Sequence, residues 1–461
     1  MNPDAIAQIY ASDIVSGFDI YKPEKMNVLF ARYGDQGASY FQLLRSLGFE
    51  KEVSLDTYGH YEENRIHEVC IVDDTVAQPA VGATITFVLS SDSLDANNNF
   101  YVRQWDIILF PNEVTGSVTA IDVTTPTAPA VTCTLNDDTD QFPALAAGDE
   151  LIIISNAFSE GSGQPDGAIR GTWEYDNDAQ IIKETIGFTG SEMVNQDWFD
   201  VTSMGYKIPA YYFLGQVDID YRMALRIDGA LLFGKRTVNT NLVDSDTGRA
   251  IKTTEGFVPY ARRVGNEQSY TSGTFDIGEF DEMDNTLDRE GAGNHILGLL
   301  GITLSQDIEN ALVTYFADTN IQYARQTTNE VLFKANESLG ASVNFKYLTK
   351  SERTFLFKRM GVFNNPKLYG ATGYENIGPK LGLFMPINKK KDPVSGNMVE
   401  SIGTRYRGLG RYSRRMEVWQ VSGAGEGLKV TEFDKRETYQ RCHVGAHFRG
   451  GNQFVILEPS S

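Results

Sequence analysis

Two histidines at ligand-like spacing are the first residues that could do chemistry. His443 and His447 stand four residues apart in RCHVGAHFRGG, and on a helix both rings would lie on one face and could hold a metal ion. The flanking glycines and the following NQFVIL favour an extended segment, in which the rings pack or form hydrogen bonds. Cys442 and His443 would then point to opposite faces of a strand, so they make no nucleophile and base pair. We therefore expect no metal site and no catalytic residue in this segment.

Acidic residues offer calcium binding or acid and base catalysis as further chemistry. Asp244, Asp246 and Glu255 match positions 1, 3 and 12 of a calcium loop, but Arg249 stands where the sharp turn requires glycine. Adjacent acids such as those at 137–138 could form a catalytic pair. The chain has 61 Asp and Glu residues, so such pairs are expected by chance. We expect no catalytic, metal-binding or cofactor-binding residue among them.

The densest group of positive residues lies in the last quarter of the chain. It consists of Lys389, Lys390, Lys391, Arg405, Arg407, Arg411, Arg414 and Arg415. These residues either form a solvated surface or meet an anionic partner, which would be an acidic surface of a neighbouring copy or DNA. The sequence leaves both alternatives open.

Charge is divided unevenly along the chain. The formal net charge of −20 argues against a protein whose main task is to grip nucleic acid by its phosphates. Residues 1–340 hold 21 Lys and Arg against 51 Asp and Glu, whereas residues 341–461 hold 20 against 10. Within 71–170 there is no lysine, and two arginines face 14 acids. This division favours contacts between copies, because a heterologous interface pairs two different patches.

Length and composition limit the class of protein. A chain of 461 residues is long enough for two to four structural units, since single cores stop growing at about 250 to 300 residues. We expect no secretion signal and no membrane span, because no basic segment precedes an apolar run and no long apolar stretch occurs. The three cysteines are far apart and odd in number, which predicts free thiols in a reducing cytoplasm.

The elements that would position these residues include one long helix and one all-β unit. Short β-branched and aromatic runs between Gly, Pro, Asn and Asp clusters predict a β unit over 71–170. Pro209 can open a helix that continues to Lys235. Its predicted apolar stripe is formed by Leu214, Val217, Tyr221, Leu225 and Leu232.

The remaining pattern predicts shorter elements. Thr303 with Gln306 and Thr349 with Glu352 are expected as capping boxes. Helices are expected at 39–49, with Phe41, Leu44 and Leu47 on one face, and at 280–291, 303–319 and 349–361. Strands are expected at 171–200, 329–348, 382–388, 413–421, 428–434 and 450–459, and residues 236–275 are expected to be mostly loop.

Three phrases carry a resemblance to a known family. They are GDELIIISNAFSEGSGQPDG, QVDIDYRMALRIDGALLFGKR and TTEGFVPYARRVGN. Together with the order of elements, they resemble the major capsid proteins of tailed double-stranded DNA phages, most of all those of crAss-like phages. The resemblance implies the α+β Hong Kong 97 phage capsid fold and covers nearly the whole chain.

The resemblance also implies a division into domains. Residues 1–50 would be the N-terminal arm, and 51–205 an E-loop carrying the inserted acidic β domain at about 71–170. Residues 206–240 would hold the spine helix of the peripheral domain, and 241–345 would be mainly the axial domain. Residues 346–461 would complete the peripheral domain and carry the basic patch.

In function, the resemblance implies a self-assembling structural protein and not an enzyme. Copies would form the hexamers and pentamers of an icosahedral head that encloses double-stranded DNA. Partners would be the chain itself, the portal, auxiliary or decoration proteins, a scaffold where one is used, and packaged DNA on the inner face without sequence specificity. The protein would be assembled in the bacterial host cytoplasm and reside in the virion, with no cofactor and no membrane partner.

Two other classes of protein compete with this interpretation. A tail or adhesin protein could carry a carbohydrate-binding β domain, but such proteins are commonly β-rich throughout, whereas this sequence predicts a long helix. A glycoside hydrolase would use two carboxylates in a deep cleft. The sequence gives no reason to expect such a cleft.

Overall fold

The computed structural model describes residues 40–63, 69–94, 100–165, 172–194, 200–203, 206–318, 346–350, 352–374, 376–387, 389–391, 396, 398–425 and 428–460. The chain divides into two units, of which the first comprises Met1–Tyr58 and Asp176–Ser461 and the second Gly59–Tyr175. All the α-helices described belong to the first unit, and both units contain β-sheet. The expected mixture of helices and strands is confirmed.

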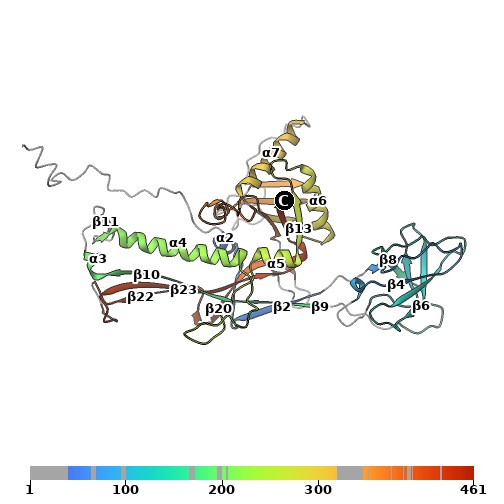
Figure 1. Cartoon of the computed structure of the whole chain (residues 1–461), viewed down its shortest axis with the longest axis horizontal. Coiled ribbons are helices and arrows are strands. Elements are labelled where there is room, and N and C mark those ends of the chain that lie inside the picture. Colours follow the sequence, from blue (N-terminus) through green and yellow to red (C-terminus); the bar gives the residue numbers. More distant parts are fainter. Residues whose placement is uncertain are drawn as a thin grey trace, which may run out of the picture. The chain divides into compact units, whose positions relative to one another are not determined.

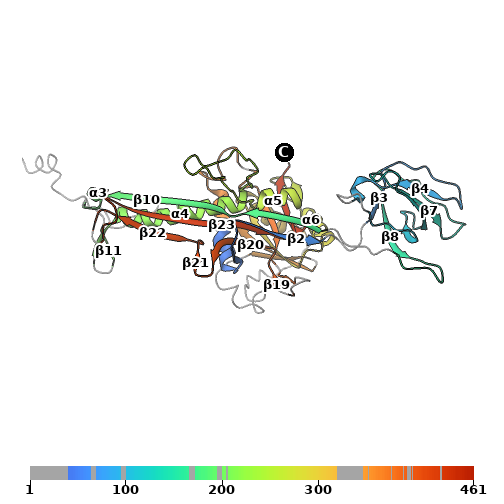
Figure 2. The same ribbon diagram turned by 90° about the horizontal axis from the view of Figure 1, so that it is seen from below.

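The first sheet of unit 1 joins strands from distant parts of the sequence. Its strands follow the order β1 (Glu50–Val53), β20 (Ile402–Leu409), β23 (Lys435–Phe448) and β10 (Gln180–Thr189). The short β21 (Tyr412–Ser413) pairs with β20, and β22 (Glu417–Ser422) pairs with β23. β1 lies parallel to β20, and the other pairs are antiparallel. Figure 2 shows β10, β23 and β22 side by side.

The long predicted helix is confirmed as α4 (Ala210–Phe233), which lies lengthwise along β10 and β23 (Figure 1). Polar contacts fix its position on the sheet. The Gln216 side-chain amide donates to the Thr438 hydroxyl at 2.9 Å, and Arg226 pairs with the buried Glu184. At 1.5 Å per residue the 24 residues of α4 span about 36 Å, which suits a helix that braces a long sheet.

The buried face of α4 differs in part from the predicted stripe. Ile219, Met223, Ile227 and Leu231 are buried at four-residue spacing, together with Leu232 of the predicted stripe. Tyr221, also in that stripe, is 46% exposed. A tyrosine ring is apolar but carries a hydroxyl that can stay in water, so it does not locate a buried face as an aliphatic side chain does.

A buried carboxylate on α4 caps the short helix α2 (Tyr40–Ser46). Asp228 is fully buried, and its carboxylate accepts the Phe41 N–H at 2.7 Å and the Tyr40 N–H at 3.3 Å. The first N–H groups of a helix have no partner within the helix, so this carboxylate replaces the missing acceptors. The predicted buried face of Phe41, Leu44 and Leu47 is confirmed.

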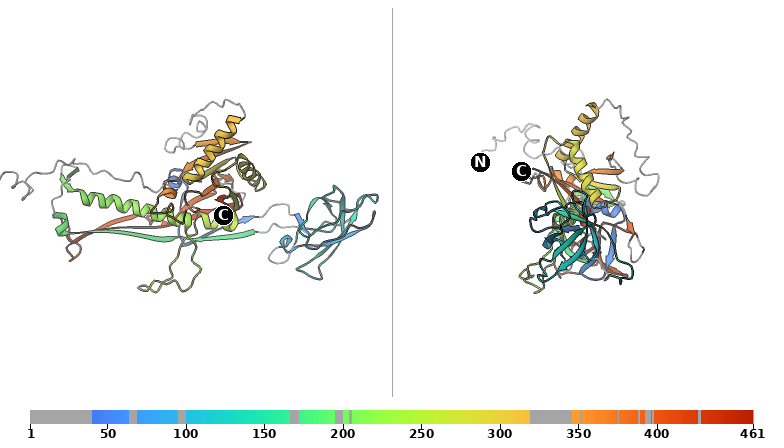
Figure 3. Two further views of the ribbon diagram at one scale, coloured as in Figure 1. Left: turned by 45° about the horizontal axis from the view of Figure 1, so that its top comes forward. Right: turned by 90° about the vertical axis from the view of Figure 1, so that its right-hand side faces the viewer.

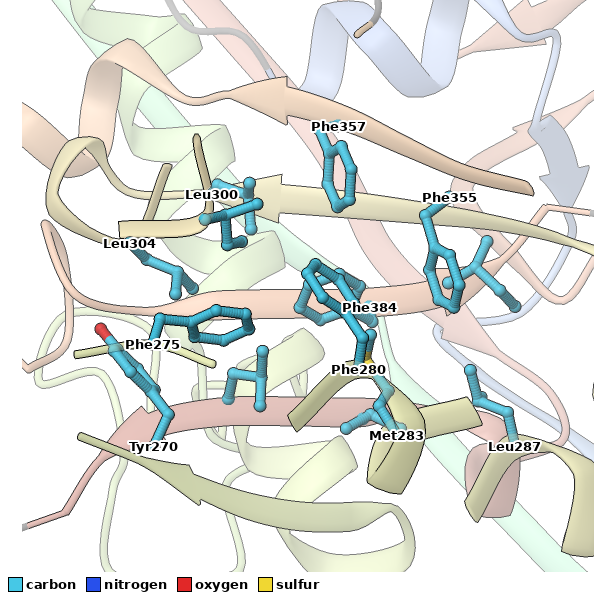
Figure 4. Packing of buried hydrophobic residues seen from close by; sticks show 14 of the residues in the cluster. Tyr270, Phe275, Phe280, Met283, Leu287, Leu300, Leu304, Phe355, Phe357 and Phe384 are labelled. Carbon is cyan, nitrogen blue, oxygen red and sulfur yellow. The ribbon is translucent and has the colours of Figure 1, made fainter. Parts of the chain in front are cut away.

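The second sheet of unit 1 has the order β13 (Asn266–Tyr270), β24 (Val455–Pro459), β17 (Gly382–Pro386), β14 (His295–Leu300), β16 (Arg353–Arg359) and β15 (Lys346–Lys350). Helix α6 (Ile277–Arg289) places Phe280, Met283 and Leu287 in the aromatic core of this sheet (Figure 4). The Phe280 and Phe355 rings lie 5.9 Å apart between centroids. Strands β15, β16, β17 and β24 lie in the range expected to complete the peripheral domain, 346–461. They share this sheet with β13 and β14, which lie in the range expected to be mainly the axial domain, 241–345.

The helix predicted at 349–361 is wrong. Most of this segment forms the end of β15 and the whole of β16, and Lys350 pairs with Arg353 between the two strands. Thr349 faces Thr354 across this hairpin, so the capping box with Glu352 does not form. The apolar run in RTFLFKR is that of a strand buried between two neighbours, which periodicity alone does not distinguish from a helix.

Three smaller expectations are also corrected. Residues 428–434 form no strand, and Leu428 is 86% exposed because no described neighbour covers it. Helix α7 (Ile302–Asp318) confirms the predicted helix, but Thr303 lies inside it, so the first N–H is satisfied by Asn364 instead of a capping box. The loop-rich region contains an unpredicted helix, α5 (Phe257–Val264).

The strands of unit 2 close into an antiparallel barrel. Their order is β3 (Val69–Ile71), β8 (Glu150–Asn156), β5 (Asp106–Leu109), β6 (Thr115–Asp122), β7 (Ala130–Leu135) and β4 (Ile85–Val88). Val72 bridges to Leu89, and the Ser90 N–H donates to the Ile71 carbonyl at 2.8 Å, so β4 meets β3 again. Figure 3 shows these blue-green strands wrapped around a shared interior. Closure leaves no exposed sheet edge along these contacts.

The remaining elements are short. β2 pairs with β9, β11 with β12, and β18 with β19. Their bounds, with those of the short helices, are β2 (Thr57–Glu63), β9 (Thr172–Asp178), α3 (Gly190–Val194), β11 (Asp200–Ser203), β12 (Tyr206–Pro209), α10 (Gly361–Asn364), β18 (Lys390–Lys391), β19 (Met398–Val399), and the 3-10 turns η1 (Ser91–Ser93) and η2 (Gly451–Gln453).

The Asp228 cap predicts a large effect of one substitution. Asp228→Ala leaves two buried N–H groups without an acceptor, and we expect a loss of about 2 to 4 kcal/mol in the free energy of unfolding, measured in urea. Asp218→Ala is the matched control, because Asp218 is exposed on the same helix and its removal should change stability by less than about 0.5 kcal/mol. Equal stability of the two variants would contradict the capping role.

Candidate assembly surface

The structure brings the predicted arginines together around β20 and the segment that follows it. Arg405 and Arg407 lie on β20, and Arg414 and Arg415 lie between β21 and β22. The Arg414 N–H donates to the Arg407 carbonyl at 2.8 Å, which joins the two segments. No hydrogen bond or ion pair among the described residues joins the exposed Lys389 to these arginines.

Four of the five arginines in the predicted basic group form ion pairs with carboxylates of the same chain. Arg407 pairs with Asp56 and Arg415 with Glu50, so residues on and just after β1 neutralise charge beside β20. Arg414 lies 3.8 Å from Glu417, measured from Nε to Oε2. The fourth pair joins Arg405 to Glu400. Much of the cluster's charge therefore serves contacts within the chain.

The pair of Arg405 and Glu400 is buried, and it is the most demanding of these contacts. Arg405 lies 3.1 Å from one Glu400 oxygen, and Lys51 lies 2.9 Å from the other. Burial alone would raise the pKa of Glu400, but the hydrogen bond from Lys51 and the charge of Arg405 lower it below its ordinary value. Burial lowers the pKa of Arg405, against the opposing effect of Glu400.

Both histidines of the predicted extended segment lie on β23 and are buried, which confirms that the segment is a strand. His443 Nε2 lies 3.2 Å from the Ala179 carbonyl, and burial lowers the pKa of its ring. The Cys442 thiol donates to the Arg415 carbonyl, and burial raises its pKa to about 12. A buried thiol with a raised pKa is a poor nucleophile.

The three acids of the hypothetical calcium loop do not converge. The Asp244 carboxylate accepts the Asp246 N–H at 3.0 Å and the Thr247 hydroxyl at 2.9 Å, which closes a local turn. Glu255 pairs instead with Arg263 at 2.8 Å. Within the described residues, no group of three or more His, Cys, Asp or Glu side chains could hold a metal ion.

Beside the paired arginines lies a surface that mixes apolar and basic side chains. The turn between β20 and β21 exposes Leu409, Arg411 and Tyr412, and Gly410 at its tip adopts φ +58°. A separate pocket of about 280 Å³ lies beside α2, lined by Phe41, Arg45, Ser413, Arg415 and Met416. Arg411 forms no ion pair with a described residue. We call Leu409, Arg411 and Tyr412 the hairpin surface.

Among the helices described, none is both long enough and apolar enough to cross a bilayer.

Comparisons with known proteins give only distant structural likeness. No family model and no curated protein matches the sequence. Solved chains of Microbacterium phage Oxtober96 (8% identity, 98% of this chain and 100% of that chain, TM-score 0.42) and Mycobacterium phage Adephagia (8%, 99% and 99%, 0.41) are similar to it in structure. So is a chain from the capsid of a native GTA particle (8%, 98% and 100%, 0.39). At TM-scores of this size, the likeness by itself assigns neither a fold nor a function.

The buried pair predicts both a stability change and a pH effect. Glu400→Gln leaves the Arg405 charge buried without its partner, and we expect a loss of about 3 kcal/mol in the free energy of unfolding at neutral pH. The pKa of Glu400 is lowered from 4.5, so its contribution is present above that pH and is lost as the pH falls further. The stability of Glu400→Gln should therefore fall less steeply in acid than that of the wild type.

Lys51→Met is the matched control for this pair. The Lys51 side chain is 49% exposed, so we expect its removal to cost less than about 1 kcal/mol in urea unfolding at neutral pH. Suppose instead that Glu400→Gln is as stable as Lys51→Met and that its free energy of unfolding falls in acid as steeply as that of the wild type. The buried pair would then not stabilise unit 1.

Proposed function

We propose that this chain is the major capsid protein of a tailed double-stranded DNA phage. In this proposal it has the Hong Kong 97 phage capsid fold and is most like the proteins of crAss-like phages. Copies assemble into hexamers and pentamers that close an icosahedral head. Its role is structural, and it is not an enzyme.

The observation that carries the proposal is a long sheet braced by one helix, with a separate unit inserted into the chain between β2 and β9. The chain enters unit 2 within β2 and leaves it within β9, and both strands precede α4 in the sequence. This supports the assignment of α4 as the spine helix and of the barrel as an insertion in the E-loop. In the same proposal residues 1–50 are the arm, 241–345 the main part of the axial domain, and 346–461 the rest of the peripheral domain.

The open edge of the first sheet also supports a protein that works as many copies. β10 presents ten residues, and among the described strands it pairs only with β23. The N–H and C=O groups on its other side are available to a further chain. A long strand with one open edge is suited to a subunit whose neighbours complete the structure.

The proposal includes the partners of the assembled shell. These are other copies of the chain, the portal, auxiliary or decoration proteins, a scaffold where one is used, and packaged DNA held on the inner face without sequence specificity. The strongly acidic barrel is suited to an outward position, away from the phosphates. Assembly takes place in the host cytoplasm, and the product is the virion.

Negative-stain electron microscopy of the purified chain tests this function. We expect closed shells or separate capsomers with five or six copies, because one type of subunit makes both contacts in such a shell. Ordered tubes or trimers would contradict the proposal and would favour a tail or adhesin protein.

Charge reversal tests whether the basic cluster takes part in assembly. We expect exchange of Arg414 and Arg415 for Glu to reduce the yield of closed particles and to change its salt dependence, because salt screens contacts between exposed charges. Both arginines also have partners in their own chain, so urea unfolding of the variant must be measured alongside. Lys389→Glu, which breaks no described ion pair, reports on surface charge alone. Unchanged yield and unchanged salt dependence in both variants would remove the cluster from the assembly contacts.

A further inference from the structure

The outer surface of the barrel exposes several apolar side chains on β8 and its neighbours. Along β8, Ile152 and Ile154 point outward and are 52% and 49% exposed. Ile152 is paired across the sheet with Val69 on β3. Beside β5, the Trp105 carbonyl accepts the Ala157 N–H at 3.1 Å, which places Trp105 next to the end of β8 and the exposed Phe158. We call Val69, Trp105, Ile152, Ile154 and Phe158 the barrel strip.

Backbone strain holds Trp105 at this surface. Its φ is +74°, a region that bulky residues rarely adopt and that costs about 1 to 3 kcal/mol. Its N–H donates to the Val118 carbonyl at 2.8 Å, and the next residue, Asp106, is buried and accepts the Arg103 N–H at 2.7 Å. The barrel thus uses well-formed hydrogen bonds to keep a strained tryptophan 43% exposed. Strained residues of this kind cluster at functional sites.

The charge around the barrel strip selects its partner. Glu150 lies on the same outward side of β8 as Ile152 and Ile154 and is exposed. Residues 71–170 hold 14 acids and two arginines, so two barrels meeting through their strips would repel one another. A complementary surface must expose apolar side chains together with unpaired positive charge.

The hairpin surface of unit 1 has that chemistry. Leu409 is 78% exposed, and Tyr412, its partner across the hairpin, is also exposed. Arg411 at the tip supplies positive charge and forms no ion pair with a described residue. Two acids lie close by: Glu52 accepts the Gly410 N–H at 2.8 Å, and Glu417, which pairs with Arg441, accepts the Tyr412 hydroxyl.

A second exposed apolar group in unit 1 fits the barrel strip less well. Leu428, Val430 and Phe433 are exposed, but Glu432 and Asp434 lie beside them, Lys429 alone offsets these two acids, and Lys435 is paired with Glu437. Those two carboxylates would face the acidic barrel. The hairpin surface is therefore the better complement.

We propose that the barrel strip of one copy docks on the hairpin surface of another copy, with Glu150 near Arg411. This rests on the proposed function only in taking the partner to be a second copy of the same chain. The two patches are different, so the contact is heterologous and each copy can offer one patch to each of two neighbours. Apolar burial supplies the attraction, and the charge selects the partner.

Disulfide trapping between two variants tests the contact. Purified Ile152→Cys chain is mixed with purified Leu409→Cys chain under mild oxidation, and the disulfide-linked pair is measured by non-reducing electrophoresis and mass spectrometry. The three native cysteines are buried, so they give little background. Two control mixtures pair Leu409→Cys with Thr86→Cys, which is exposed on β4, and Ile152→Cys with Leu428→Cys.

We expect on the order of tenfold more linked pairs in the first mixture than in either control, because docking raises the local concentration of the two thiols. Adding Arg411→Glu to the Leu409→Cys chain should lower this yield, and adding Glu150→Arg to the Ile152→Cys chain should restore it. A yield no higher than the controls would overturn the docking contact.

The two proposals fail separately. Closed shells with no specific linkage between positions 152 and 409 would overturn this contact and leave the capsid function standing. Specific linkage in a protein that forms only tubes or trimers would support the contact and contradict the capsid function.

Discussion

The carboxylate of Asp228 links helix α4 to helix α2, and through α2 it helps to position strand β1. It is buried on α4 and accepts the first N–H groups of α2. α2 leads directly into β1, which lies parallel to β20 with Glu50 opposite Thr404. Anchoring α2 therefore sets where β1 meets β20, and this places Glu50 and Asp56 beside the arginines that follow. A single buried acid thus connects the helix that braces the sheet with the charge pairs at the end of the sheet.

This arrangement changes what the basic cluster can do. Arg405, Arg407 and Arg415 are held by acids of the same chain, so their first effect is to lock β20 and its neighbours together. Arg45 and Arg411 form no ion pair with a described residue, and Arg411 lies in the turn beside the exposed Leu409 and Tyr412. The structure thus separates positive residues that stabilise one copy from positive residues that can attract another.

Part of the fold could be predicted from local pattern. The helix α4 was predictable because its apolar residues recur with helical spacing over many residues. The β unit was predictable because its β-branched and aromatic runs are separated by clusters of turn residues. β16 was not, because a buried strand between two neighbours has a continuous apolar run that a helix can also have. The buried stripe of α4 was partly misplaced for a similar reason, since Tyr221 counts as apolar in sequence but faces water.

The candidate site was predictable only as a cluster of charge. The acids that pair with Arg407 and Arg415 come from residues 50–56, at the other end of the sequence, and no local pattern links them.

We propose that copies of this one chain build a shell by making contacts of five-fold and six-fold order. Native mass spectrometry measures the masses of the soluble assemblies and so tests this proposal. We expect species at five and six times the 51.2 kDa chain, at concentrations where the separate subunits are also seen. A series of trimers, or of open chains that grow one subunit at a time without a preferred size, would contradict it.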